Sequence, residues 1–181
     1  MPAYHSTFNG ADGGAGRVLN GIPLLPLVTK TRGPAPFADA SLTYDAVDEA
    51  LELFRANSLF RNFEIKGNGD RLLVYTLLFI SQCLGKLKPT MGMGEATKTL
   101  YTLAVSNVVI PADPGFPLHN MYPAVERADA DVLRQYLLQV RQEVALRLVP
   151  LVYSDAGQPA QTPSKWWLCF QKRYFMGKAM A

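Results

Sequence analysis

The sequence predicts an all-α fold of about five helices, in which one central helix is surrounded by the others and an irregular N-terminal arm packs on them. Two observations favour this class. Apolar residues recur at helical spacing in several stretches after residue 43, and residues 70–88 are apolar on almost every side. A helix that is apolar nearly all round is a buried helix. We therefore expect one helical domain over residues 1–181.

Residues 1–41 are rich in glycine and proline and have no sustained period, which predicts an extended arm. Pro23 and Pro26 argue against a central strand there, since proline cannot donate a ladder hydrogen bond. The glycine-rich run at 10–16 follows no strand and opens no helix, so it lacks the context of a phosphate-binding loop. Part of the arm should pack on the body through its apolar residues, which are Ile22, Leu24, Leu25, Leu27 and Val28.

The first predicted helix follows Thr43, the expected N-cap. Its apolar residues fall within one stripe: Tyr44, Val47, Leu51 and Phe54. Its acidic residues occupy the opposite, outward face: Asp45, Asp48, Glu49 and Glu52. We interpret these acids mainly as a solvated stripe, and a docking face for basic residues of a partner is the alternative.

The central helix is expected to open at Asp70 and to close near Gly85 and Pro89. Its few polar positions after the start form one narrow ridge, so nearly all of its surface should be covered. A third, shorter helix is predicted over 94–106, followed by a long loop with several prolines. The β-branched run at 108–110 has no second strand with which to pair.

The fourth helix should be capped by Asp129 or Asp131 and reach about Val149. Pro150 should end or kink it, because proline removes a backbone donor and clashes one turn back. A last helix is then expected to start with Thr162 as N-cap and proline at the first helical position.

No residue pattern indicates catalysis, a cofactor or a metal site. His5 and His119 lie in segments rich in glycine or proline, and neither cysteine has a second cysteine or a histidine at ligand spacing. The longest apolar run, residues 72–80, is about half a membrane span. The N-terminus has no basic segment before an apolar run, so we expect a soluble, cytosolic protein without a signal peptide.

Residues 162–181 combine large aromatic residues with four cations and no acid, although the whole chain has a net charge of only +3. On a helical wheel the aromatic and apolar residues occupy two faces. A small domain can bury one such face in its own core, which leaves the second without an evident internal contact. We infer protein contact through Trp167, Lys172 and Arg173, because Trp, Tyr and Arg anchor interfaces. The alternatives are burial of all these aromatic residues in the core, or a membrane-surface or nucleic-acid-binding helix.

Several stretches of the chain resemble subunit 3 of the actin-related-protein 2/3 complex, the assembly that nucleates branched actin filaments. The first and last of these stretches are the most specific, and the whole set is spread over nearly the full length of the chain. They are MPAYHS, GPAPF, VDEALELFRAN, NFEIK, YTLLFISQCL, PGFPL, YLLQVRQEVALRL and PSKWWLCFQKRYFMGK.

The resemblance implies a non-catalytic structural subunit with a helical fold and no cofactor, located in the cytoplasm at branched actin networks. It implies packing against the actin-related protein 3 subunit and contact with actin-related protein 2 in the active arrangement. A position near the mother actin filament is also implied. The resemblance does not say which residues touch which subunit, so the contact candidates rest on wheel geometry. They are Trp167, Lys172, Arg173, Asp45, Asp48, Glu49 and Glu52.

Overall fold

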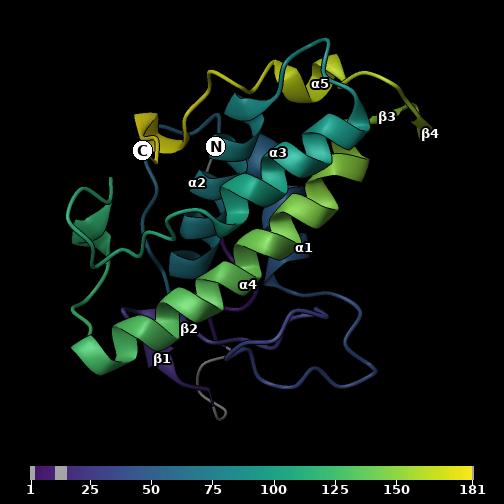
Figure 1. Cartoon of the computed structure of the whole chain (residues 1–181). Helices are drawn as coiled ribbons and strands as arrows, with labels where there is room; N and C mark the ends of the chain where they lie inside the picture. Colours follow the sequence, from purple (N-terminus) through teal and green to yellow (C-terminus); the bar gives the residue numbers. More distant parts are fainter. Residues whose placement is uncertain (1–2, 11–15, 181) are drawn as a thin grey trace.

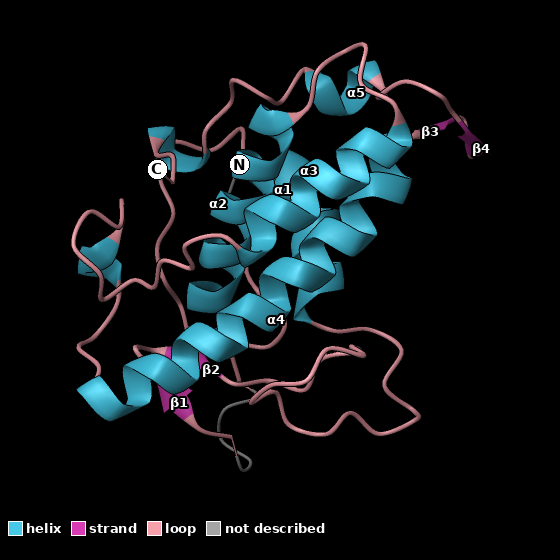
Figure 2. Cartoon of the chain, viewed as in Figure 1, coloured by secondary structure: helices cyan, strands magenta, loops and turns pink. Residues whose placement is uncertain are grey.

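A computed structural model describes residues 3–10 and 16–180 of the chain. Over these residues five α-helices account for most of the regular structure (Figures 1 and 2). They are α1 (Ala46–Asn57), α2 (Asn68–Lys86), α3 (Met93–Val105), α4 (Arg127–Val152) and α5 (Lys165–Leu168). Two short 3₁₀ turns, η2 (His119–Met121) and η3 (Phe175–Gly177), add to the helical content. The predicted helical class is thus largely right.

Two small antiparallel hairpins correct the prediction of a purely helical fold. Strand β1 (Val18–Leu19) pairs with β2 (Ile22–Pro23), and β3 (Ser154–Asp155) pairs with β4 (Gln158–Pro159). Each turn has two residues with positive φ, and Asn20–Gly21 is a strong sequence signal for such a turn. Strands of two residues carry too little hydrophobic pattern to be found by periodicity.

Helix α2 lies at the centre, as predicted. Fourteen of its nineteen residues are buried, and it packs against α1, α3 and α4 as well as β2. Figure 1 shows α3 and the long helix α4 side by side, with α2 behind them. The helix begins at Asn68 rather than at Asp70, whose fully buried carboxylate binds the N-terminal arm instead.

Helix α4 differs from its prediction at both ends. It begins at Arg127, with Glu126 in the N-cap position, and it continues through Pro150 to Val152. Pro150 removes the helical partner of the Leu146 carbonyl. Both residues are exposed, with Leu146 at 65%, so water can reach this part of the helix and limits the cost of the lost hydrogen bond.

The arm packs on the helices through most of its apolar residues. Leu19, Ile22, Leu24, Leu25 and Leu27 are buried in the same core cluster as α2, whereas Val28 is 43% exposed. The part of the glycine-rich run at 11–15 lies outside the described residues. Among the described helices, none is both long and apolar enough to cross a membrane.

Candidate interaction surface

The acidic residues of α1 do not form the outward stripe that the sequence predicts. Asp45 and Glu49 are 1% and 2% exposed, and only Glu52 is open to solvent while Asp48 is half-buried. Asp45, not Thr43, is the N-cap, and its carboxylate accepts from the amides of Val47 and Asp48. The interpretation as a solvated stripe is therefore wrong for Asp45 and Glu49.

Asp45 is covered because Arg147 of α4 reaches across to it. Arg147 Nη1 and Nη2 donate to the two carboxylate oxygens at 2.7 and 2.9 Å, and Nη2 also donates to the Val28 carbonyl. Burial by itself raises the pKa of Asp45, but the hydrogen bonds from Arg147 and from the Val28 amide outweigh it. The pKa of Asp45 is therefore held below its usual value. Asp45 thus joins the arm, α1 and α4.

Glu49 is covered by the N-terminal arm. The Ser6 hydroxyl donates to Glu49 Oε1 at 2.5 Å, and the Thr7 hydroxyl and amide donate to Oε2 at 2.6 and 2.9 Å. Beside it, the Asp70 carboxylate accepts from the Ser6 amide and pairs with His5 Nδ1, both at 2.7 Å. These carboxylates hold residues 5–7 in place. The Ser6 hydroxyl donates to Glu49 and His5 pairs with Asp70, so these side chains attach the arm to α1 and α2.

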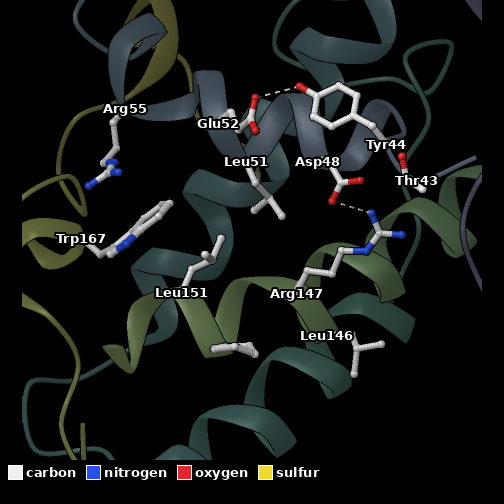
Figure 3. A pocket seen from close by; sticks show the side chains of 11 residues that line it. Thr43, Tyr44, Asp48, Leu51, Glu52, Arg55, Leu146, Arg147, Leu151 and Trp167 are labelled. Carbon is white, nitrogen blue, oxygen red and sulfur yellow. Dashed lines mark hydrogen bonds and ion pairs between the residues drawn. The ribbon is translucent and has the colours of Figure 1, made fainter. Parts of the chain in front are cut away.

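An open groove lies between α1 and α4 and is closed at one end by Trp167 (Figure 3). Its volume is about 650 Å³. Figure 3 shows Leu51, Leu151 and Trp167 directed into it, with the Asp48–Arg147 ion pair and the Glu52–Tyr44 hydrogen bond at its rim. The lining residues are Thr43, Tyr44, Asp48, Leu51, Glu52, Arg55, Leu146, Arg147, Pro150, Leu151 and Trp167.

The groove combines an apolar floor with charged groups. Leu146 and Leu151 are 65% and 43% exposed, although they lie on a helix whose opposite side is core. The Arg55 guanidinium lies 4.7 Å from the centre of the Trp167 ring, so a cation packs against this ring in addition to its apolar neighbours. Of the predicted contact residues, this groove brings together Asp48, Glu52 and Trp167.

The C-terminal segment is not the long helix that the wheel assumed. Helix α5 has four residues, with Ser164 rather than Thr162 as its N-cap, and the chain then follows turns to η3. The two predicted faces therefore do not exist. An interpretation as a membrane-surface or nucleic-acid-binding helix also loses its structural basis, because four residues cannot form an amphipathic face.

Four of the C-terminal aromatic residues fall into a buried pair and an exposed pair, which differ from the two predicted helix faces. Phe175 is fully buried, with its ring 5.4 Å from that of Phe63, and Trp167 is 6% exposed and stacked on Phe54. Trp166 is instead 62% exposed, and Tyr174 is 46% exposed. The predicted anchor Trp167 is thus mainly a core residue that also ends the groove. Its neighbour Trp166 is the exposed tryptophan.

Trp166 belongs to a basic surface. Lys165 Nζ lies 5.2 Å from its ring centre, and the Arg173 guanidinium lies 5.9 Å from the centre of the Phe170 ring. Lys172, Arg173 and the thiol-bearing Cys169 are exposed as well. We call this set the tail surface: Lys165, Trp166, Cys169, Lys172, Arg173 and Tyr174. Within the described residues, no group of three or more His, Cys, Asp and Glu side chains is placed to bind a metal ion.

Comparison with known proteins gives a match over almost the whole chain. Residues 1–180 match the family described as P21-Arc: ARP2/3 complex ARPC3 (21 kDa) subunit. The chain is 48% identical to the actin-related protein 2/3 complex subunit 3 of Saccharomyces cerevisiae, over 99% of this chain and 100% of the yeast protein. It is 46% identical to the subunit 3 of Dictyostelium discoideum, over 98% of this chain and 99% of that protein. It is 39% identical to that of Arabidopsis thaliana, over 96% of each chain.

Proposed function

The chain belongs to the family of ARPC3 (21 kDa) subunits of the ARP2/3 complex, and from this membership we propose that it is a structural subunit of that complex. In this role it supports the nucleation of branched actin filaments in the cytoplasm and catalyses no reaction itself. The observation that carries the proposal is the likeness over residues 1–180, which includes the helices, the arm and the tail surface.

Within the complex, we propose that the chain packs against the actin-related protein 3 subunit. In the active arrangement it also meets the actin-related protein 2 subunit, close to the mother filament. Two features support a role in assembly. The groove between α1 and α4 leaves Leu146 and Leu151 uncovered, and the tail surface exposes Trp166 beside cations. Tryptophan and arginine supply much of the binding free energy at protein interfaces.

The structure changes the choice of contact residues within this proposal. Lys172, Arg173 and Trp166 are the candidates on the tail surface, and Asp48 and Glu52 remain candidates at the rim of the groove. The carboxylates of Asp45 and Glu49 already bind groups of this chain, so a partner would have to displace those groups first.

A rigid subunit can favour the active arrangement by making a contact that exists only there. Such a contact shifts the equilibrium by its difference in free energy between the two arrangements, whatever its total strength. A difference of about 1.4 kcal/mol changes the population ratio tenfold. A desolvated aromatic or arginine anchor supplies that much, whereas an exposed ion pair rarely does.

Replacement of Lys172 and Arg173 by alanine tests the tail surface. We expect the double variant to fold normally, to co-purify less with the actin-related subunits, and to lower the rate of filament nucleation. A matched control is the double variant of Lys88 and Lys98, which removes the same charge from exposed positions elsewhere. If the tail variant and the control both assemble and nucleate like wild type, the tail surface makes no functional contact.

A further inference from the structure

Phe37 is the most exposed large hydrophobic residue in the described part of the chain. Its exposed fraction is 93%, and the next values are 65% for Leu146 and 62% for Trp166. It lies in the segment 29–44, which joins the arm to α1 and projects away from the helices at the lower right of Figure 1. A ring that is exposed to this extent buries little apolar area and contributes little to the stability of the fold.

The base of this loop is closed by hydrogen bonds to the buried Asp45 carboxylate and to Arg147. The Val28 amide donates to Asp45 Oδ2 at 2.9 Å, and Arg147 Nη2 donates to the Val28 carbonyl at 2.6 Å. The two ends of the loop are therefore held together at the N-terminus of α1. A loop whose ends lie close together resembles an Ω-loop, and such loops are frequently functional.

A second set of contacts fixes the loop close to Phe37. Gln139 of α4 is 2% exposed, its Oε1 accepts from the Ala35 amide and its Nε2 donates to the Thr31 carbonyl, both at 2.9 Å. A Cβ added at Gly33 would lie 2.3 Å from Gln139 Cδ, so the backbone approaches this amide as closely as glycine allows. Pro34 and Pro36 further restrict the backbone. The buried Gln139 side chain of α4 thus holds the loop that carries the exposed Phe37 ring.

The charges on the loop indicate what kind of surface it meets. Lys30 and Arg32 are exposed, and in the described residues neither forms an ion pair. The one acid of the segment, Asp39, accepts from the Ser41 amide within the loop. Two exposed cations in the same loop as an exposed aromatic ring fit a partner surface that has an apolar socket with carboxylates at its rim.

We propose that Phe37 is a preformed anchor that inserts into an apolar, acid-rimmed socket on another protein subunit of the assembly. This inference rests on the proposed function as a subunit. Because Gln139 and the prolines already order the loop, little conformational entropy is lost on binding, which is the advantage of a preorganised anchor. A protein socket fits better than a membrane surface, because membrane binding through basic clusters generally uses about four to eight cations.

The test compares four variants in the full chain, each assembled with the remaining subunits of the complex. Phe37→Ala should leave the thermal unfolding temperature unchanged and weaken binding to those subunits at least about tenfold. Phe37→Leu should retain part of the affinity, because it keeps an apolar side chain. Gly33→Ala should weaken binding with Phe37 still present, because the new methyl group displaces the Gln139 amide. Tyr101→Ala removes an aromatic ring that is 55% exposed on α3 and is the matched control.

The outcomes separate this inference from the proposed function. If the wild-type chain does not assemble with actin-related subunits, both fail. If wild type assembles and Phe37→Ala assembles equally well, or loses no more affinity than Tyr101→Ala, only the anchor is wrong. Binding to vesicles of anionic phospholipid is the second assay. If the chain binds these vesicles through Phe37 while assembly is unchanged, the proposal of a protein socket is wrong and Phe37 contacts a membrane.

Discussion

Arg147 on α4 binds both carboxylate oxygens of Asp45, a fully buried side chain at the start of α1, at 2.7 and 2.9 Å. The residues are 102 positions apart, so this contact exists only when α1 and α4 are packed together. Because Arg147 also binds the Val28 carbonyl, the same guanidinium fixes the base of the 29–44 loop. One ion pair therefore connects the helical body to the segment that presents Phe37.

Replacement of Arg147 by methionine should destabilise the chain by about 3–5 kcal/mol, because it leaves the Asp45 carboxylate buried without a cation. Urea unfolding, monitored by circular dichroism, measures this change. Arg134→Met is the control, since the Arg134–Asp113 pair is partly exposed and should contribute about 1 kcal/mol or less. An equal loss of unfolding free energy in the two variants would show that the buried Asp45–Arg147 pair stabilises the chain no more than the partly exposed pair does.

The stability should also fall in acid through Asp45. Its folded pKa is depressed, because the hydrogen bonds from Arg147 and the Val28 amide outweigh the effect of burial. A depressed pKa gives stability that is fully present above the unfolded value of about 3.9 and is lost as the pH falls through the folded value. Asp45→Asn should therefore be less stable than wild type near neutral pH, and the difference should shrink below about pH 4. A constant difference across this range would contradict the assignment.

The helices could be predicted from the sequence because their apolar residues recur within short windows. The wheel failed for Asp45 and Glu49 because it shows which residues share a face, not which distant segment covers that face. Ser6 and Thr7, which cover Glu49, lie 43 and 42 residues away. No local pattern links these positions. Burial of Glu49 can therefore be recognised only when the position of the N-terminal arm is known.

The path of the C-terminal segment was predicted wrongly for a different reason. The wheel assumed a continuous helix through residues 162–181, but α5 ends at Leu168 and Met176 has a φ of 52°, which no α-helix contains. Aromatic residues have only modest helix propensity, so the five between residues 166 and 175 do not sustain a helix without packing. The choice between Trp166 and Trp167 then depends on the path of the chain, which periodicity cannot supply.

Glu49 should control the attachment of the N-terminal arm. Glu49→Ala removes the acceptor for the Ser6 and Thr7 hydroxyls and for the Thr7 amide. We expect hydrogen exchange of the amides of residues 6–8 to accelerate, while the amides at the centre of α2 keep their protection, because the change opens one local segment. Glu52→Ala is the matched control on the same helix, since Glu52 is exposed and, within residues 3–10 and 16–180, its carboxylate accepts only from the Tyr44 hydroxyl. Unchanged exchange in Glu49→Ala would mean that other contacts hold the arm.

The two cysteines should differ sharply in reactivity. Cys83 is fully buried in α2, and burial raises the pKa of its thiol, whereas Cys169 is exposed on the tail surface. The thiolate is the reactive species, so a thiol reagent should modify Cys169 in the folded chain and Cys83 only after unfolding. Cys169→Ser should abolish the fast reaction. In the assembled complex, slower labelling of Cys169 would indicate that a partner covers the tail surface, and an unchanged rate would indicate that it stays open.

The exposed and buried aromatic residues of the tail should separate assembly from folding. Phe175 is fully buried against Phe63, so Phe175→Ala should cost about 3–5 kcal/mol of stability. Trp166 is 62% exposed and contacts mainly Lys165, so Trp166→Ala should change stability by about 0.5 kcal/mol or less. If Trp166 is an interface anchor, its variant should nevertheless weaken co-purification with the actin-related subunits about tenfold or more. Urea unfolding and quantitative pull-down from the same preparations measure both effects. A Trp166 variant that unfolds easily would place this ring in the core, and one that is stable and assembles normally would remove it from the interface.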